Sequence, residues 1–260
     1  MSRITKVIGA TALALACAAG SVAHAADVTI GALFPLSGLN ASYGDIFGSG
    51  ANLAAEHINA DNMLDGKLSI QYEDSQALPQ QGLIGMNKLV NVQKVPYVLS
   101  AFTGVSKAIS AIGARTKTIA VNGGGVGPDL AELGPYFWNV ITLANFEVRA
   151  ALPYLVNERK LKRFVLVYVD DPLGQSIRKE MEGALPGVGG QLIEALSVPA
   201  TMQQFSGIAA RVRSANADVV YIASYGSQQA QIMKQFRDNG INQQFVSYSG
   251  VATPEIAALP

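Results

Sequence analysis

The feature that most constrains the fold is an alternation of short apolar strand patterns with helical patterns along nearly the whole chain. The first unit shows it, since Val28–Phe34 is an apolar run rich in strand-forming residues and a break follows at residues 35–38. Apolar residues then recur at helical spacing between Ile46 and Ile58. Strands that alternate with helices predict an α/β protein with mostly parallel sheets, each covered by helices on both faces.

The alternation falls into two successive sets with the same rhythm. The first set has strand patterns at residues 28–34, 68–72, 96–99, 118–121 and 136–140. The second set restarts after Asn145 and has strand patterns at residues 163–169, 191–196, 218–223 and 244–247. These sets predict two Rossmann-like lobes, residues 26–143 and 144–260, which are joined by a simple crossing of the chain.

Residues 1–25 differ from the rest of the chain and predict a secretory signal peptide. Arg3 and Lys6 precede a mostly apolar run at residues 7–19, and small residues at 23–25 provide a cleavage site near Ala25. The run is too short for a membrane-spanning helix, and no later apolar run is long enough to cross a bilayer.

The only cysteine, Cys17, lies inside this predicted signal peptide. A lipid anchor on Cys17 would need a leucine three positions earlier, where the sequence has Ala14. We therefore expect an exported mature protein without a disulfide or a lipid anchor, which a sizeable core must stabilise.

The composition argues against several partners and cofactors. Acidic and basic residues are equal in number, at 19 each, and this neutral balance argues against a nucleic acid or an anionic membrane as partner, since both need a basic face. The mature chain has a single histidine, His57, and no cysteine, so no metal site is predicted. A dinucleotide cofactor is not predicted either, because Pro128 follows the glycines at residues 123–127 where a helix would have to begin.

Two loops that follow neighbouring strands of the first lobe predict an anion site. Residues 100–106 are small and hydroxylated, and residues 122–128 are rich in glycine, which can adopt φ > 0 and direct backbone N–H groups at an anion. Ser106 is expected at the start of a helix, where free N–H groups also favour negative charge. An ordinary helix cap is the alternative role for Ser106. A bound carboxylate would suit both loops.

The same loop raises an enzymatic alternative, a secreted α/β hydrolase. Gly104-Val105-Ser106-Lys107-Ala108 follows a predicted strand and resembles a nucleophile elbow with Ser106 as the nucleophile. A catalytic triad would need a histidine on a strand-end loop, whereas His57 falls inside the first predicted helix. A non-enzymatic protein is therefore the preferred interpretation.

Several segments resemble the leucine/isoleucine/valine-binding protein family, the periplasmic receptors of ABC importers. They include Ser37-Gly38 followed by Tyr43-Gly44-Asp45, the strand end Val169-Asp170-Asp171-Pro172-Leu173-Gly174, the segment 205–212 before the strand at 218–221, and Tyr225-Gly226. The family has an aromatic residue commonly where Leu173 stands. The resemblance implies a type I periplasmic binding fold and a monomer in the periplasm. It also implies a small carboxylate-bearing ligand between the lobes and an ABC permease in the membrane as the partner.

The resemblance also implies a set of ligand-binding residues: Tyr43, Phe102, Thr103, Gly104, Ser106, Gly124, Gly125, Val126, Leu173, Tyr225 and Ser249. In amino-acid-binding members of the family, hydroxyls and backbone groups of the first lobe hold the α-carboxylate, and acidic residues hold the ammonium. Here Val126 stands where a threonine is common, and the two acidic positions fall on Ala144 and Ser249. Asp170 or Asp171 is the alternative partner for an ammonium, although an acid at a strand end usually caps the next helix. An unpaired buried cation is costly. We therefore expect a carboxylate without an α-ammonium, an aromatic or short aliphatic acid, with an amino acid as the alternative.

The length of the chain carries one more expectation. Members of that family continue beyond the second lobe and return to the first, whereas this sequence ends at Pro260, just after the last predicted strand. We expect a fragment or truncated product that lacks the return segment and exposes an edge of the first sheet.

Overall fold

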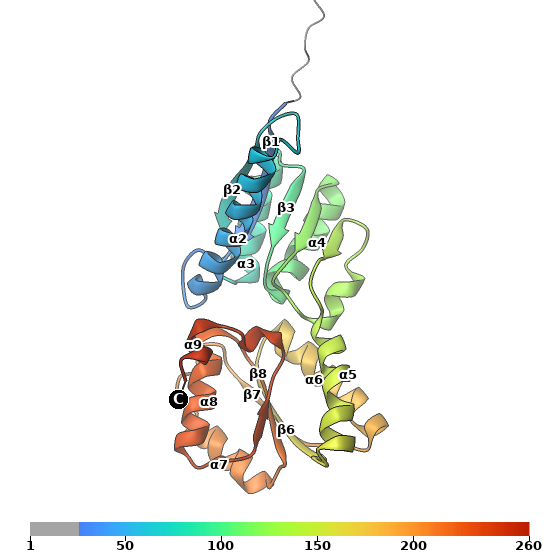
Figure 1. The fold of residues 1–260 in the computed structure, drawn as a ribbon, viewed down its shortest axis with the longest axis vertical. Coiled ribbons are helices and arrows are strands. Elements are labelled where there is room, and N and C mark those ends of the chain that lie inside the picture. Colours follow the sequence, from blue (N-terminus) through green and yellow to red (C-terminus); the bar gives the residue numbers. More distant parts are fainter. Residues whose placement is uncertain (1–25, 260) are drawn as a thin grey trace, which may run out of the picture.

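The computed structural model describes residues 26–259, and Figure 1 shows two lobes stacked along the long axis of the molecule. The first lobe contains a five-stranded sheet of order β2-β1-β3-β4-β5, and the second contains a four-stranded sheet of order β7-β6-β8-β9. All the pairings between these strands are parallel, which confirms the predicted α/β class. The strands are β1 (Val28–Phe34), β2 (Leu68–Asp74), β3 (Tyr97–Ser100), β4 (Ile119–Asn122), β5 (Phe137–Asn139), β6 (Arg163–Val169), β7 (Gln191–Val198), β8 (Val219–Ala223) and β9 (Gln244–Val246).

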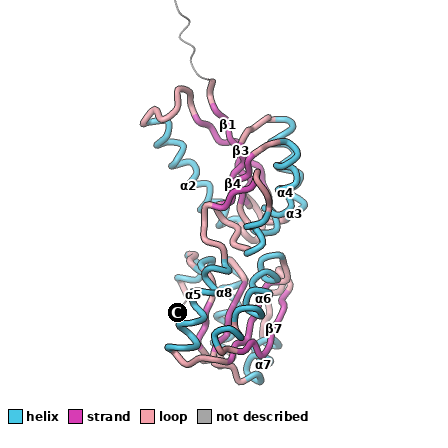
Figure 2. The backbone as a smooth tube through the Cα atoms, turned by 90° about the vertical axis from the view of Figure 1, so that its right-hand side faces the viewer, coloured by secondary structure: helices cyan, strands magenta, loops and turns pink. Residues whose placement is uncertain are grey.

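Helices cover both faces of each sheet. Figure 2 shows α2 on one side of the first sheet and α3 with α4 on the other. The helices of the first lobe are α2 (Ala41–Ala60), α3 (Pro79–Asn87), the π-helical turn η1 (Lys88–Val92), α4 (Thr103–Thr116) and the 3₁₀ turn η2 (Pro128–Glu132). Those of the second lobe are α5 (Ala144–Pro153), the π-helical turn η3 (Tyr154–Glu158), α6 (Pro172–Ala184), η4 (Pro186–Val188), α7 (Ser206–Ala215), α8 (Gly226–Asp238), η5 (Ser249–Val251) and α9 (Pro254–Ala257).

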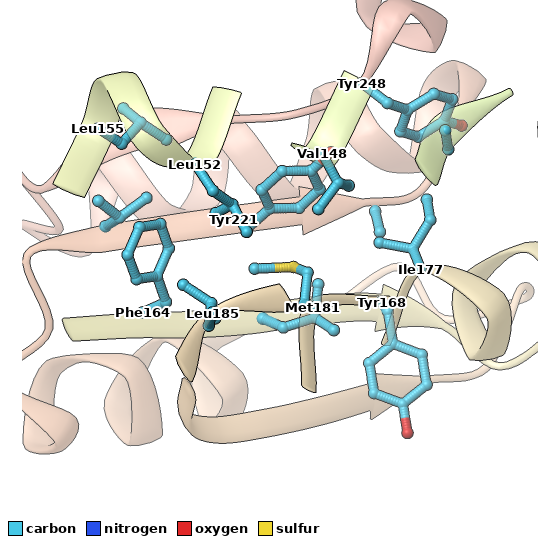
Figure 3. Close-up of a cluster of buried hydrophobic side chains, with 14 of the residues drawn as sticks. Val148, Leu152, Leu155, Phe164, Tyr168, Ile177, Met181, Leu185, Tyr221 and Tyr248 are labelled. Atoms are coloured by element: carbon cyan, nitrogen blue, oxygen red, sulfur yellow. The ribbon is translucent and has the colours of Figure 1, made fainter. Parts of the chain in front are cut away.

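The central strand β6 is buried on both faces, as its continuous apolar sequence predicts. Alternate side chains point to opposite sides, so Phe164 and Leu166 face α5 and α6 while Val165 and Val167 face α7 and α8. Figure 3 shows the first of these two layers, in which Tyr221 of β8 lies between Leu152 of α5 and Met181 of α6. This packing holds the carboxyl ends of β6 and β8 in fixed positions.

The chain passes from the first sheet to the second lobe after β5. Ala144 begins α5 and is fully buried in the core of the second lobe. The boundary between the lobes at residues 143 and 144 stays a prediction. The predicted signal peptide at residues 1–25, with Cys17, lies outside the described residues.

The helix α4 begins three residues before the position predicted from the sequence. Its first residue is Thr103, and the residue before it, Phe102, has φ 67° and ψ 130°. This positive φ is a strained conformation for a bulky L-residue, and it turns the chain from β3 directly into the helix. Ser106 therefore lies in the helix interior and does not begin it. Between residues 26 and 259, no helix is long and apolar enough to cross a membrane.

Substitution of Phe164 by alanine should destabilise the second lobe by about 3–5 kcal/mol, because the side chain is fully buried and leaves a cavity. Urea unfolding followed by circular dichroism measures the change. The control is Phe146→Ala, since Phe146 is 61% exposed and its loss should change the free energy of unfolding by less than about 0.5 kcal/mol. Equal effects of the two substitutions would contradict the packing described for this layer.

Candidate functional site

A cavity of about 810 Å³ lies between the lobes, at the carboxyl ends of strands from both sheets. Ligands of open α/β sheets bind at such strand ends. All of the residues predicted for the site line this cavity except Ser106: Tyr43, Phe102, Thr103, Gly104, Gly124, Gly125, Val126, Leu173, Tyr225 and Ser249. The fold therefore brings this set together, while a role of each residue in binding stays a prediction.

Ser106 is the exception, and its placement corrects two interpretations. Its side chain is fully buried, lies 3.0 Å from the hydroxyl of Ser100 and donates to Asn122 Oδ1 at 3.4 Å. It therefore neither lines the cavity nor caps α4, and no substrate carbonyl has access to it. His57 lies near the end of α2, about ten residues and roughly 15 Å beyond the cavity-lining Phe47. The hydrolase interpretation finds no support in this geometry.

The glycine-rich loop after β4 also differs from the expectation of an anion-binding concavity. Gly124 and Gly125 donate their N–H groups to Asn122 Oδ1 at 3.3 and 2.7 Å, and Gly127 donates to Thr103 Oγ1 at 3.0 Å. None of these glycines has a positive φ. Their N–H groups are occupied within the protein, so the loop is not the predicted anion cradle.

The glycines of this loop are needed instead for close packing. A Cβ on Gly125 would lie 2.9 Å from the backbone carbon of Phe102 and from the nitrogen of Thr103. A Cβ on Gly124 would lie 2.8 Å from the Cβ of Ala101. The loop can approach the start of α4 only without side chains, and this contact forms the first-lobe wall of the cavity.

With Ser106 and the glycine-rich loop excluded, the N-terminus of α4 is the part of the first-lobe wall that can bind an anion. Its N-cap residue Phe102 makes no side-chain cap hydrogen bond, and both Thr103 and Gly104 line the cavity. The first N–H groups of a helix have no partners within the helix and carry a partial positive charge. This end of the cavity can therefore receive a carboxylate.

The second lobe supplies acidic side chains, of which Glu147 was not predicted from the sequence. Glu147, Asp170 and Asp171 line the cavity, and its lining contains no lysine, arginine or histidine. Glu147 lies one helical turn after Ala144 and accepts hydrogen bonds from Ser249. Ala144 and Ser249 are the two positions where the family has acidic residues, so Glu147 lies beside both. The two aligned positions carry no acid, but Glu147 brings a carboxylate to the same region of the cavity. The sequence could have indicated this carboxylate, because Glu147 follows Ala144 by three residues and therefore lies on the same face of the helix.

Asp171 has a structural role at the cavity. It is the N-cap of α6 and accepts from the N–H of Gly174 and from the hydroxyl of Tyr225, both at 2.9 Å. Burial raises the pKa of Asp171, and these hydrogen bonds oppose that shift. Burial, followed by the neighbouring Asp171, raises the pKa of Tyr225, so Tyr225 keeps its proton. The pair fixes the tyrosine ring against the cavity.

Aromatic side chains from both lobes meet across the cavity. The ring of Phe102 packs edge-on against Tyr43 and Tyr225, with ring centres 5.5 and 5.4 Å apart. Tyr43 also joins the lobes through its hydroxyl, which accepts from the N–H of Gly226 at 3.0 Å and donates to the carbonyl of Gly250 at 3.2 Å. Two further cavity-lining aromatic residues, Phe47 and Tyr248, were not predicted from the sequence. Phe47 belongs to α2 and Tyr248 to the loop after β9, and the direction of each side chain depends on how the lobes pack.

Metal ligation finds no candidate in the part of the chain that the structure describes. No group of three or more histidine, cysteine, aspartate or glutamate side chains is placed to hold an ion there. The acidic side chains of the cavity are engaged by hydrogen bonds from Ser249, Gln175, Gly174 and Tyr225.

Two parallel α/β lobes with a cavity lined by both define the class of bilobal ligand-binding proteins. A family model described as "Periplasmic binding protein" matches residues 27–260, so the chain belongs to this family, whose members are periplasmic solute-binding proteins. The resemblance found in the sequence is thereby confirmed.

Curated relatives agree with this assignment. The chain is 28% identical over 253 residues to an "Amino acid binding protein" of Pseudomonas aeruginosa, which covers 96% of this chain and 68% of the relative. It is 26% identical over 261 residues to the "Leucine-specific-binding protein" of Salmonella typhimurium, which covers 99% of this chain and 70% of the relative.

Solved structures share the fold. A solute binding protein from R. palustris in complex with 4-hydroxybenzoate has a TM-score of 0.79 at 20% identity, covering 90% of this chain and 66% of that one. A branched-chain amino acid transporter substrate binding protein from Streptococcus pneumoniae in complex with isoleucine has a TM-score of 0.80 at 22% identity, covering 89% and 67%. The chain spans about two thirds of the length of these proteins.

Substitution of Tyr43 by phenylalanine should weaken ligand binding by about 3- to 30-fold, because it removes two hydrogen bonds between the lobes and favours their separation. Titration calorimetry with whichever amino acid or benzoate binds the unmodified chain measures the loss. Tyr72→Phe is the matched control, since its hydroxyl donates to Asn52 within the first lobe. Unchanged affinity in Tyr43→Phe would show that these interlobe bonds do not favour the liganded state.

Proposed function

We propose that this chain is the solute-binding protein of an ABC importer and acts as a monomer in the periplasm. It binds an α-amino acid with an apolar side chain between its lobes and presents it to a permease complex in the membrane. Residues 1–25 act as the signal peptide that directs export. The family assignment supports the first statement, and the electrostatics of the cavity support the choice of ligand.

The observation that carries the ligand class is the uncompensated negative charge of the cavity. Three carboxylates line it, and no cationic side chain does. A ligand with only a carboxylate would meet repulsion there, and the repulsion strengthens as the lobes exclude water. An ammonium group reverses the sign of this interaction. The sequence favoured an acid without an ammonium because Ala144 and Ser249 stand at the two aligned acidic positions, and the carboxylate of Glu147 reverses that preference.

The first-lobe wall of the cavity suits the other half of an amino acid. The free N–H groups at the start of α4 favour a carboxylate, and Phe102, Val126 and Leu173 supply apolar surface for a side chain. A volume of about 810 Å³ is within the usual range for small-molecule sites. The names of the relatives, an amino acid binding protein and a leucine-specific-binding protein, support the same class.

One observation favours a second candidate, an aromatic acid. Tyr43, Phe102 and Tyr225 present aromatic surface to the cavity, and one protein of the same fold was solved with 4-hydroxybenzoate. An aromatic acid would stack on these rings and place its carboxylate at α4. It would leave the carboxylates of the second lobe without a counter-charge, so the amino acid is preferred.

A thermal-shift panel of the twenty amino acids, benzoate and 4-hydroxybenzoate on the full chain distinguishes the two candidates. At a hundredfold excess over Kd, a true ligand adds about 2.7 kcal/mol of stability. For a protein of this size the gain should raise Tm by several degrees. We expect an apolar amino acid to produce the shift. A shift with the benzoates alone would overturn the proposed ligand class while leaving the solute-binding role in place.

Binding between the lobes should also favour their closure, because a ligand held by both lobes stabilises the closed arrangement more than the open one. Small-angle scattering should therefore give a smaller radius of gyration with the amino acid found in the panel than without it. The same value with and without saturating ligand would count against a site between the lobes.

A further inference from the structure

Among the carboxylates of the cavity, Glu147 is held differently from the other two. Ser249 donates its N–H to Glu147 Oε2 at 2.6 Å and its hydroxyl to Glu147 Oε1 at 2.7 Å. Both bonds come from a single residue at the end of the second sheet and reach a side chain of α5, far away in the sequence. They fix the plane and the direction of the carboxylate without neutralising its charge.

The other two acids are less suited to meet a ligand cation. Asp171 already accepts one hydrogen bond on each oxygen, from the start of α6 and from Tyr225, and it is needed there as a helix cap. Asp170 is exposed at the strand end and accepts from the side-chain amide of Gln175. Water screens an exposed carboxylate, so its attraction for a bound cation is weak.

The cation nearest in sequence on the same helix does not compensate Glu147. Arg149 forms a two-pronged ion pair with Glu180 of α6, at 2.6 and 3.3 Å. No ion pair of Glu147 with a lysine, arginine or histidine exists among residues 26–259. The charge of Glu147 is therefore oriented, partly buried and available to a ligand.

We infer that Glu147 binds the ammonium group of the ligand and that Ser249 is the residue that positions it. This inference rests on the proposed amino-acid ligand and names the residue that distinguishes an amino acid from the same molecule without its amino group. Ser249 stands at a position expected to be acidic by resemblance. In this chain the acid is supplied by α5 and the serine directs it, so the two residues act as one recognition unit.

The test compares each amino acid with its deaminated acid by titration calorimetry on the full chain. The probe pairs are leucine with 4-methylpentanoate, valine with 3-methylbutanoate, and phenylalanine with 3-phenylpropanoate. Glu147→Gln removes the charge and keeps the shape. It should weaken binding of the amino acid by about 30-fold or more, because the ammonium loses the oriented charge that pairs with it. Binding of the deaminated acid should change by less than about threefold, or tighten, since repulsion is removed.

Ser249→Ala separates positioning from folding. It should weaken binding of the amino acid by about 3- to 10-fold through loss of the hydroxyl bond, with little effect on the deaminated acid. Ser249→Thr keeps a hydroxyl and should restore most of the preference. Glu158→Gln is the matched control, an acid-to-amide change on an exposed residue of η3 outside the cavity, and it should leave both affinities unchanged.

The possible outcomes separate this inference from the proposed function. If no amino acid binds the unmodified chain, the proposed ligand class fails. Suppose that an amino acid binds and that Glu147→Gln lowers the affinity for the amino acid and for its deaminated acid equally. Glu147 then has a structural role, and the inference fails while the proposed function stands. If Glu147→Gln does not fold, Ser249→Ala decides: an unchanged ratio of the two affinities overturns the inference.

Discussion

The first-lobe wall of the cavity depends on the buried side chain of Asn122 at the end of β4. Its Oδ1 accepts from the N–H groups of Gly124 and Gly125, and its Nδ2 donates to the carbonyl of Gly125 and to Asn139 Oδ1. One amide thus satisfies the polar groups of a tight glycine loop that would be costly to bury unpaired. With the loop held in this way, its glycines can contact the start of α4. The helix terminus then faces the cavity.

The second-lobe wall of the cavity is negatively charged, in contrast to the helix N-terminus of the first-lobe wall. Its acidic side chains are oriented by hydrogen bonds from Ser249, Tyr225 and the start of α6, and none is neutralised by a cation in the cavity lining. The helix N-terminus in the first-lobe wall and the carboxylates in the second-lobe wall complement the two charged groups of the proposed amino-acid ligand. A preorganised arrangement of this kind reduces the reorganisation that accompanies binding, which favours affinity and selectivity.

The lobes meet around the cavity through contacts that are specific but few. Tyr43 bonds to Gly226 and Gly250 on one side, and Ser176 of α6 donates to Asp129 of η2 at 3.1 Å on another. Asp129 is also paired with Lys107 of α4. Each bond contributes only about 0.5–1.5 kcal/mol, so these hydrogen bonds stabilise the contact between the lobes modestly. A ligand that touches both walls can therefore shift the balance between open and closed states.

The sequence by itself determined the fold class, and it predicted which loops surround the cavity. Strand and helix periodicity predicted the sheets, and the family resemblance named Tyr43, Phe102 and Tyr225 as cavity residues. These positions gather because the carboxyl ends of parallel strands lie at one edge of each sheet. Only the tertiary structure decided which groups face the ligand. Ser106 turned inward because α4 begins at Thr103, the glycine amides were occupied by Asn122 and Thr103, and Glu147 reached the cavity through Ser249. Spacing along the chain specifies the edge where a residue lies, whereas side-chain direction and hydrogen-bond partners depend on contacts between residues distant in sequence.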